Sequence, residues 1–142
     1  MTKFIAFSEA DAIAFHGMAL IAKSETAINA VDISEAIGAS KHHASKVLQK
    51  LVKNGILGST RGPSGGFYLA RPADEIKIIE ILQAIEGEVS LSNCPIDNAF
   101  CPFGNCLMGG ICHEVSEKLV DHLKTHTLQD MINNIPPDRK LF

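Results

Sequence analysis

The chain has 142 residues, of which 46% are hydrophobic, and a net charge of −3 at pH 7 with histidine counted as neutral. This length and composition are typical of one globular domain with a short appended element, and they exclude a largely disordered chain. No apolar run reaches the roughly 18 to 20 residues that a membrane-spanning helix needs. Residues 1–7 lack the long apolar core of a signal peptide. We therefore expect a cytoplasmic protein with no membrane partner.

Helix starts and stops are marked in the first part of the chain. Ser8 followed by Glu9 and Asp11 predicts a helix start, because a hydroxyl and acidic groups satisfy the free amides of a first turn. Small and apolar residues then recur on one helical face. A second, short helix is predicted from a cap at Asn29 to a left-handed stop at Gly38.

A third helix is predicted from a cap at Ser40 to a stop at Gly55. Polar and basic side chains occupy one of its faces, and the other is an apolar stripe. Two helices separated by a glycine-containing turn, the second of them basic on its outer side, are typical of a helix-turn-helix. The stripe that we expect to be buried consists of Ala44, Val47, Leu48, Leu51 and Val52.

A glycine-rich turn follows between two short apolar runs. Ile56 and Leu57 precede the turn, which extends from Arg61 to Gly66, and residues 67–69 follow it. This pattern predicts two short strands joined as a β-hairpin. A hairpin beside a helix-turn-helix is the wing of a winged-helix domain, whose second helix enters the major groove of DNA while the wing contacts the backbone or minor groove.

Basic residues are concentrated in one part of this acidic protein, residues 36–73, which we call the basic stretch. It holds six Lys and Arg residues and no Asp or Glu, whereas the remainder has seven Lys and Arg against sixteen Asp and Glu, a charge of −9. A concentrated positive field favours a local polyanion contact, although the alternative is a solvated helix surface. The predicted contacts with double-stranded operator DNA are Ser40, Lys41, His42, His43, Ser45, Lys46, Lys50, Arg61, Ser64 and Arg71.

Two longer helices are predicted in the second half of the chain. An apolar run from Ile76 to Ile85, ended by Gly87, predicts a helix that packs under the winged domain. A second helix is predicted over residues 111–128, and Thr127 with Asp130 predicts a short helical restart. The long helix has an apolar stripe that packs either on its own domain or on a second copy, which palindromic operators favour. The stripe is Ile111, Val115, Leu119 and Leu123.

Four cysteines lie close together in a segment rich in Pro, Gly and Asn. Cys94, Cys101, Cys106 and Cys112 are separated by six, four and five residues. The paired spacing of a structural zinc site is absent, while an iron–sulfur cluster tolerates wider spacing. Structural disulfides are not expected in a reducing compartment. The spacing therefore favours a cluster, with zinc or free redox-sensing thiols as the alternatives.

The order of these elements resembles the Rrf-two family of bacterial regulators, the type that includes IscR and NsrR. The resemblance rests on the wing motif from Arg61 to Arg71 and on a cysteine loop leading into a long helix. It implies a homodimeric winged-helix transcription factor, mainly α-helical with a small β-hairpin wing and a long C-terminal dimerisation helix. It divides the chain into a DNA-binding domain (residues 1–89), a cysteine loop (residues 90–110), and a dimerisation helix with a C-terminal tail (residues 111–142).

The same resemblance implies a [2Fe-2S] or [4Fe-4S] cluster in each subunit. Cys101, Cys106 and Cys112 match the three usual ligands, and Cys94 is a fourth ligand, a replacement for one of the three, or a nearby thiol. Some members of the family complete the set with a His or a carboxylate, in some cases from the first helix of the other subunit. The alternatives here are His16, Asp11 and His113, although Asp11 equally completes the Ser8 cap and a lone His on a helix is usually a surface residue.

These observations predict a DNA-binding transcriptional regulator, with repression as the expected mode, whose operator affinity depends on a cluster that senses redox state, nitric oxide or iron status. The alternative is a metal-free or zinc-stabilised winged-helix regulator that uses its thiols as redox sensors. An enzyme or electron carrier is disfavoured. The sequence has no nucleotide-binding glycine motif and no recognisable arrangement of Ser, His and acid.

Overall fold

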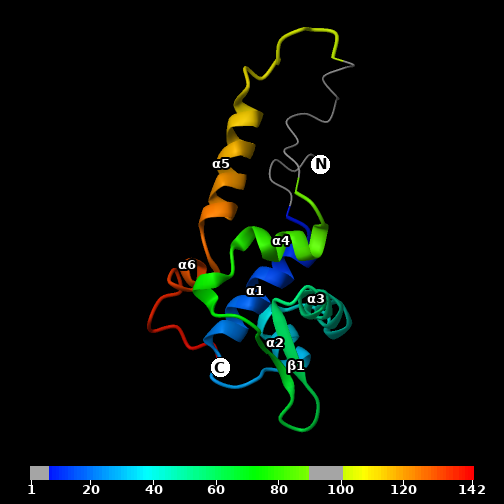
Figure 1. Cartoon of the computed structure of the whole chain (residues 1–142), viewed down its shortest axis with the longest axis vertical. Coiled ribbons are helices and arrows are strands. Elements are labelled where there is room, and N and C mark those ends of the chain that lie inside the picture. The colour runs from blue at the N-terminus through cyan, green and yellow to red at the C-terminus, as the bar shows by residue number, and fades with distance from the viewer. Residues whose placement is uncertain (1–6, 90–100) are drawn as a thin grey trace.

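The computed structural model describes residues 7–89 and 101–142. It is mostly helical with one two-stranded antiparallel sheet, which confirms the predicted winged-helix fold class. Figure 1 shows the helices gathered around α1, the hairpin at one end of the molecule and α5 projecting at the other. The elements are α1 (Glu9–Lys23), α2 (Ala30–Ile37), α3 (Lys41–Lys53), β1 (Leu57–Thr60), β2 (Gly66–Leu69), the 3-10 turn η1 (Ala73–Glu75), α4 (Ile78–Glu86), α5 (Ile111–Thr125) and α6 (Leu128–Ile132).

The first three helices begin at the predicted caps. The Ser8 hydroxyl accepts a hydrogen bond from the Asp11 N–H at 3.1 Å, and the Asp11 carboxylate accepts one from the Ser8 N–H at 2.8 Å. The side chains of Asn29 and Ser40 likewise accept from the backbone N–H three residues further along. Gly38 ends α2 with a φ of 69°, a left-handed conformation that glycine adopts without a steric penalty.

The core lies between α1 and the helices around it. Helix α1 packs against α2, α3, α4 and α6. The predicted stripe of α3 is buried except for Val52, which is partly buried. Removing this much apolar surface from water is the main stabilising term of such a domain. The largest fully buried apolar side chains are Met18, Ile33, Leu48, Leu51, Ile76, Ile81 and Leu128.

The hairpin has a third, unpredicted pairing partner. Within the hairpin, Leu57 pairs with Leu69 and Thr60 with Gly66. In addition, the Phe67 N–H donates to the Ile28 carbonyl at 2.8 Å and the Ile28 N–H donates to the Phe67 carbonyl at 3.1 Å. The base of the wing is thereby tied to the segment that leads into α2.

Replacing Gly66 by Ala is expected to lower the free energy of unfolding by about 1 to 3 kcal/mol. A Cβ atom at this position would lie 2.5 Å from both the carbonyl carbon and the carbonyl oxygen of Ile28, which are fixed by the bridge to Phe67. Gly62→Ala is the control, because its Cβ would meet nothing within 4 Å although its φ of +107° is strained for Ala. Urea denaturation measures both variants. A midpoint for Gly66→Ala no lower than that for Gly62→Ala would contradict the clash.

Two predicted helix boundaries were wrong, and one long-range contact explains both. The predicted start at Ile76 is replaced by a start at Ile78, and the predicted end at Leu128 by an end at Thr125. The Ile78 N–H donates to the His126 carbonyl at 3.0 Å and the Leu128 N–H to the Ile76 carbonyl at 2.8 Å. This antiparallel bridge keeps both segments extended. The predicted restart is confirmed, because Thr127 and Asp130 form a capping box at the start of α6.

No helix within the described ranges combines the length and the apolar character needed to cross a bilayer.

Candidate nucleic-acid interface and cysteine loop

The outer face of α3 presents most of the predicted DNA contacts. Lys41, His42, Lys46 and Lys50 are exposed, and Ser45 is half-buried. Since α3 carries its apolar stripe inward, the ammonium groups lie on its outer side, where phosphates or base edges could reach them, and Lys50 also interacts with the Glu86 carboxylate.

Two predicted contacts on α3 also serve the domain itself. The Ser40 hydroxyl accepts the His43 N–H at 3.1 Å and so caps the helix. The His43 Nδ1 atom lies 3.7 Å from an Oε1 atom of Glu9 on α1. An exposed pair of this kind contributes little to stability. It nevertheless places a carboxylate at one edge of the basic face.

The wing presents its predicted contacts at the turn. Arg61 and Ser64 are exposed between β1 and β2, and β1 packs against α3. Gly65 lets the turn close tightly, since a Cβ there would lie 2.5 Å from the Thr60 carbonyl oxygen. The turn therefore extends Arg61 from the end of a rigid hairpin.

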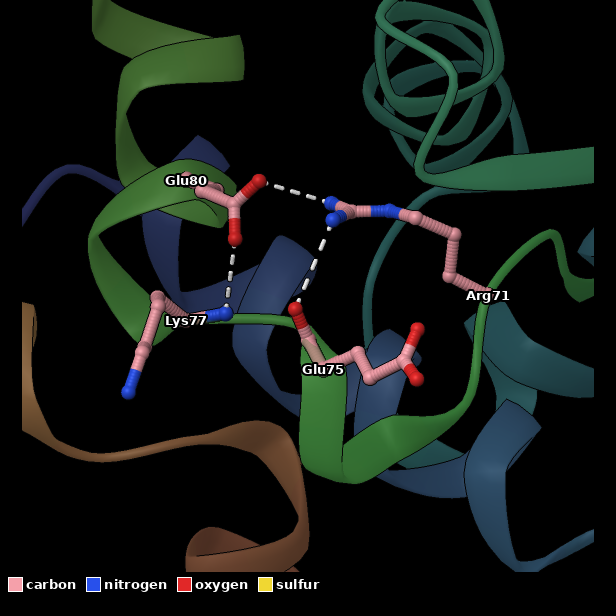
Figure 2. A network of polar contacts seen from close by, with 4 residues as sticks. All are labelled: Arg71, Glu75, Lys77 and Glu80. Atoms are coloured by element: carbon pink, nitrogen blue, oxygen red, sulfur yellow. Dashed lines mark hydrogen bonds and ion pairs between the residues drawn. The ribbon is translucent and has the colours of Figure 1, made fainter.

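Arg71 is placed differently from the other basic residues. Its Nη2 atom lies 2.7 Å from an Oε1 atom of Glu80 on α4, and its Nη1 atom lies 3.4 Å from the Glu75 carbonyl oxygen, as Figure 2 shows. Burial alone would raise the pKa of Glu80, but hydrogen bonds from the Lys77 N–H and the Arg71 guanidinium bring it below its usual range. Arg71 thus joins the end of the wing to the start of α4.

The described part of the cysteine loop, residues 101–110, carries Cys101 and Cys106 and leads to Cys112 in the first turn of α5. Cys101 and Cys112 are partly buried and Cys106 is exposed. Among the described residues, no three His, Cys, Asp or Glu side chains gather into a group that could hold a metal ion. Cys94 lies outside the described residues.

Backbone N–H groups of the loop lie near the exposed Cys106 thiol. Hydrogen bonds from the N–H groups of Gly110 and Met108, with a weaker one from Gly109, lower the pKa of this thiol below its usual value. Gly110 and Gly109 have left-handed φ values of 82° and 65°, conformations that favour glycine. This arrangement favours the thiolate, the form that binds metals and reacts with oxidants.

The three alternative ligands each have a local partner. Asp11 is 2% exposed and completes the cap of α1. Its burial raises the pKa of its carboxyl above the usual value, and no residue within the described ranges hydrogen-bonds to its Oδ1 atom. His16 is exposed, with Nδ1 2.7 Å from the Ala12 carbonyl oxygen, and His113 Nε2 lies 3.1 Å from an Oε1 atom of Glu117. These contacts favour the capping and surface roles.

The model of one protein family, described as an iron-dependent transcriptional regulator and named Rrf2, matches residues 7–134 of the chain. The match covers the helix-turn-helix, the wing, the cysteine loop and both C-terminal helices. The chain belongs to the Rrf2 family. This finding confirms the predicted family, whose description is that of a transcriptional regulator and not of an enzyme.

Two relatives in the Rrf2 family are named HTH-type transcriptional regulator IscR. The protein from Klebsiella pneumoniae (strain 342) is 34% identical over 104 residues, which are 72% of this chain and 63% of the relative. The protein from Escherichia coli O1:K1 / APEC is 33% identical over 104 residues, 72% of this chain and 64% of the relative. The chain therefore spans less than two thirds of the length of these relatives.

Solved structures show the same fold. Similarity to T. potens IscR has a TM-score of 0.71 at 22% identity and covers 96% of this chain and 92% of that one. Similarity to CymR, titled the global cysteine regulator of B. subtilis, has a TM-score of 0.75 at 21% identity and covers 93% of this chain and 99% of that one. At these identities the likeness supports the Rrf2 fold and no finer property.

Two features of the site were missed by reasoning from the sequence. The pairing of Arg71 with Glu80 joins residues that are nine positions apart and lie in different elements. The only related signal in the sequence is Glu80 itself, an acidic residue three positions after Lys77, which is typical of a helix start. The donors around Cys106 follow from the left-handed glycines that come after it, a signal that the sequence does contain.

Proposed function

We propose that this chain is a DNA-binding transcriptional repressor that acts as a homodimer and whose operator affinity depends on an iron–sulfur cluster in the cysteine loop. The observation that carries the proposal is the basic outer face of α3 next to a basic wing, within a stretch that has no Asp or Glu. Family membership supports regulation of transcription.

The DNA contacts divide by position. The outer face of α3 has the dimensions and charge to enter the major groove, where Lys46 and Lys50 meet phosphates or base edges. Arg61, at the tip of the hairpin, is placed for the backbone or the minor groove. The acidic remainder of the chain keeps the rest of the surface away from the polyanion.

The donor chemistry of the cysteine loop fits an iron–sulfur cluster of the [2Fe-2S] or [4Fe-4S] type, one per subunit. Cys101, Cys106 and Cys112 would hold it, with Cys94 as a further ligand from outside the described residues. Such a cluster supplies a centre that responds to redox state and is open to attack by oxidants. The lowered pKa of Cys106 favours the thiolate that a metal requires.

The apolar stripe of α5 supports a dimer. Leu123 is buried against Ile78, Ile79 and Leu82, and Leu119 packs partly against the same cluster. Toward the start of the helix the stripe is open, with Ile111 45% and Val115 36% exposed. Phe103, Leu107 and Met108 add exposed apolar surface in the cysteine loop. A second copy packed along α5 would cover this surface and pair two recognition helices for a palindromic operator.

Replacing Lys46 or Arg61 by Gln is expected to weaken operator binding. The probe is the tightest duplex that the wild-type protein selects from a random-sequence pool. Affinity falls as salt rises, and loss of one phosphate contact makes the slope of log affinity against log salt less steep by about 0.9. Loss of a base contact instead reduces the discrimination against the wrong base by about 1 to 3 kcal/mol.

Lys23→Gln is the control for this experiment, because Lys23 is a lysine on α1 outside the basic stretch. It should leave both the affinity and the salt slope close to those of the wild type. Equal losses in all three variants would mean that the basic stretch is not the DNA-binding surface.

A further inference from the structure

Arg71 lies where the wing rejoins the body of the protein. It follows β2 by two residues and precedes η1, the turn that leads to α4. Its guanidinium is directed at Glu80 on α4 although 38% of the side chain remains exposed, with one nitrogen 2.7 Å from the Glu80 carboxylate and the other 3.4 Å from the Glu75 backbone oxygen (Figure 2). A guanidinium held at two points by its own protein is poorly placed to bind a phosphate as well.

Glu80 uses both carboxylate oxygens. Oε1 accepts from Arg71 at 2.7 Å, and Oε2 accepts from the Lys77 N–H at 2.8 Å. The second bond satisfies the free backbone N–H of Lys77 at the start of α4, so the position of the carboxylate is set by the first turn of that helix. The Glu80 carboxylate, held by the start of α4, therefore fixes the position of the Arg71 guanidinium.

Helix α4 lies between the DNA-binding elements and α5. On one side, Ile81 and Ile85 belong to the main core with residues of α1 and α3. On another side, Ile78, Ile79 and Leu82 pack against Leu123 of α5. Helix α5 therefore meets the rest of the protein mainly through α4, with Phe15 of α1 and Met131 of α6 at the edge of the same cluster.

We propose that Arg71 is a positioning residue, which fixes the wing to α4 through Glu80 and so makes the fit of the wing on DNA depend on the position of α4 and α5. This inference rests on the proposed DNA-binding function. It assigns to Arg71 a role in orienting the wing in place of the direct DNA contact predicted from its charge.

The two roles for Arg71 predict opposite effects of changing Glu80. If Arg71 contacts phosphate, Glu80→Gln removes a neighbouring negative charge, and DNA binding should become tighter. If Arg71 positions the wing through Glu80, the same change loosens the link between the wing and α4, and binding should become weaker. Gln retains an acceptor for the Lys77 N–H, so the cap of α4 is preserved in this variant.

The test measures affinity of the full-length protein for the duplex selected by the wild type and for an unrelated duplex, each over a range of salt concentrations. The variants are Arg71→Gln, Glu80→Gln and the double variant. Glu75→Gln is the matched control, because it removes an equal charge nearby while Glu75 contributes only its backbone oxygen to the network. Thermal midpoints establish that each variant is folded at the temperature of the assay.

The proposal predicts that Arg71→Gln and Glu80→Gln each bind the selected duplex roughly 2- to 30-fold more weakly. The double variant should be no weaker than either single variant, because both changes break one link. The salt slope should stay at the wild-type value, and Glu75→Gln should bind like the wild type. If Arg71→Gln fails to fold, Glu80→Gln carries the same comparison.

Glu80→Gln binding as tightly as the wild type or tighter would overturn the inference. The inference would also be overturned if the slope of log affinity against log salt became less steep by about 0.9 in Arg71→Gln, the change expected for a lost phosphate contact. In both cases the proposed function would stand. A wild-type protein that selects no duplex from the pool would instead remove the proposed function itself.

Discussion

Val115→Glu is expected to convert the protein from a dimer to a monomer at micromolar concentrations. Val115 lies in the open part of the α5 stripe, one turn from Ile111 and one from the partly buried Leu119. In a two-fold interface along this stripe, each copy would bury an unpaired carboxylate. An uncompensated buried charge costs about 3 to 5 kcal/mol, which corresponds to more than about a hundredfold in the dimer dissociation constant.

Lys124→Glu is the control for this variant. It places a carboxylate on the same helix but outside the stripe, at an exposed position, and it changes the net charge by more than Val115→Glu does. Sedimentation velocity of the three proteins separates an interface effect from a general charge effect. A wild type that sediments as a monomer, or a Val115→Glu variant that sediments as a dimer, would contradict the proposed interface.

Much of the fold was predictable because its signals are local. The caps at Ser8, Asn29 and Ser40 and the stop at Gly38 depend on residues within one helical turn, and the structure has all of them as predicted. The same holds for the inward stripe of α3, which follows from helical periodicity alone.

The features that were missed depend on partners distant in the sequence. Ile76 fits the apolar pattern of the predicted helix. It is nevertheless extended, because its carbonyl oxygen accepts a hydrogen bond from the N–H of Leu128, more than fifty positions away. The bridge between Ile28 and Phe67 is of the same kind. Periodicity within a window carries no information about such pairs.

The residue types at the candidate site could be predicted from the sequence, but the contacts that each residue makes could not. The charge count identified the basic stretch, but it could not separate Arg61, which is exposed at the wing, from Arg71, which is held by Glu80. Likewise, the spacing of the cysteines identified a donor set. It did not reveal that backbone N–H groups distinguish Cys106 from the other thiols.

Cys106→Ala is expected to abolish retention of the iron–sulfur cluster while leaving the fold intact. Cys106 lies between two other cysteines in the sequence, and backbone N–H donors lower the pKa of its thiol below the usual value, so its removal takes away a ligand from the middle of the donor set. Because this residue is exposed and outside both apolar clusters, the thermal midpoint of the apo protein should change little. Iron and sulfide contents after purification without oxygen measure the effect.

Leu107→Ala is the matched control, since Leu107 is adjacent, 76% exposed and unable to bind iron. It should retain iron at the wild-type level. Comparing operator binding by wild type and Cys106→Ala at fixed salt then tests sensing, for which a useful coupling is about 1 to 3 kcal/mol, or roughly 5- to 150-fold in affinity. Unchanged iron in Cys106→Ala would contradict its role as a ligand. A colourless wild type containing zinc, or one with no metal and an operator affinity that changes on thiol oxidation, would favour the metal-free or zinc-stabilised regulator instead.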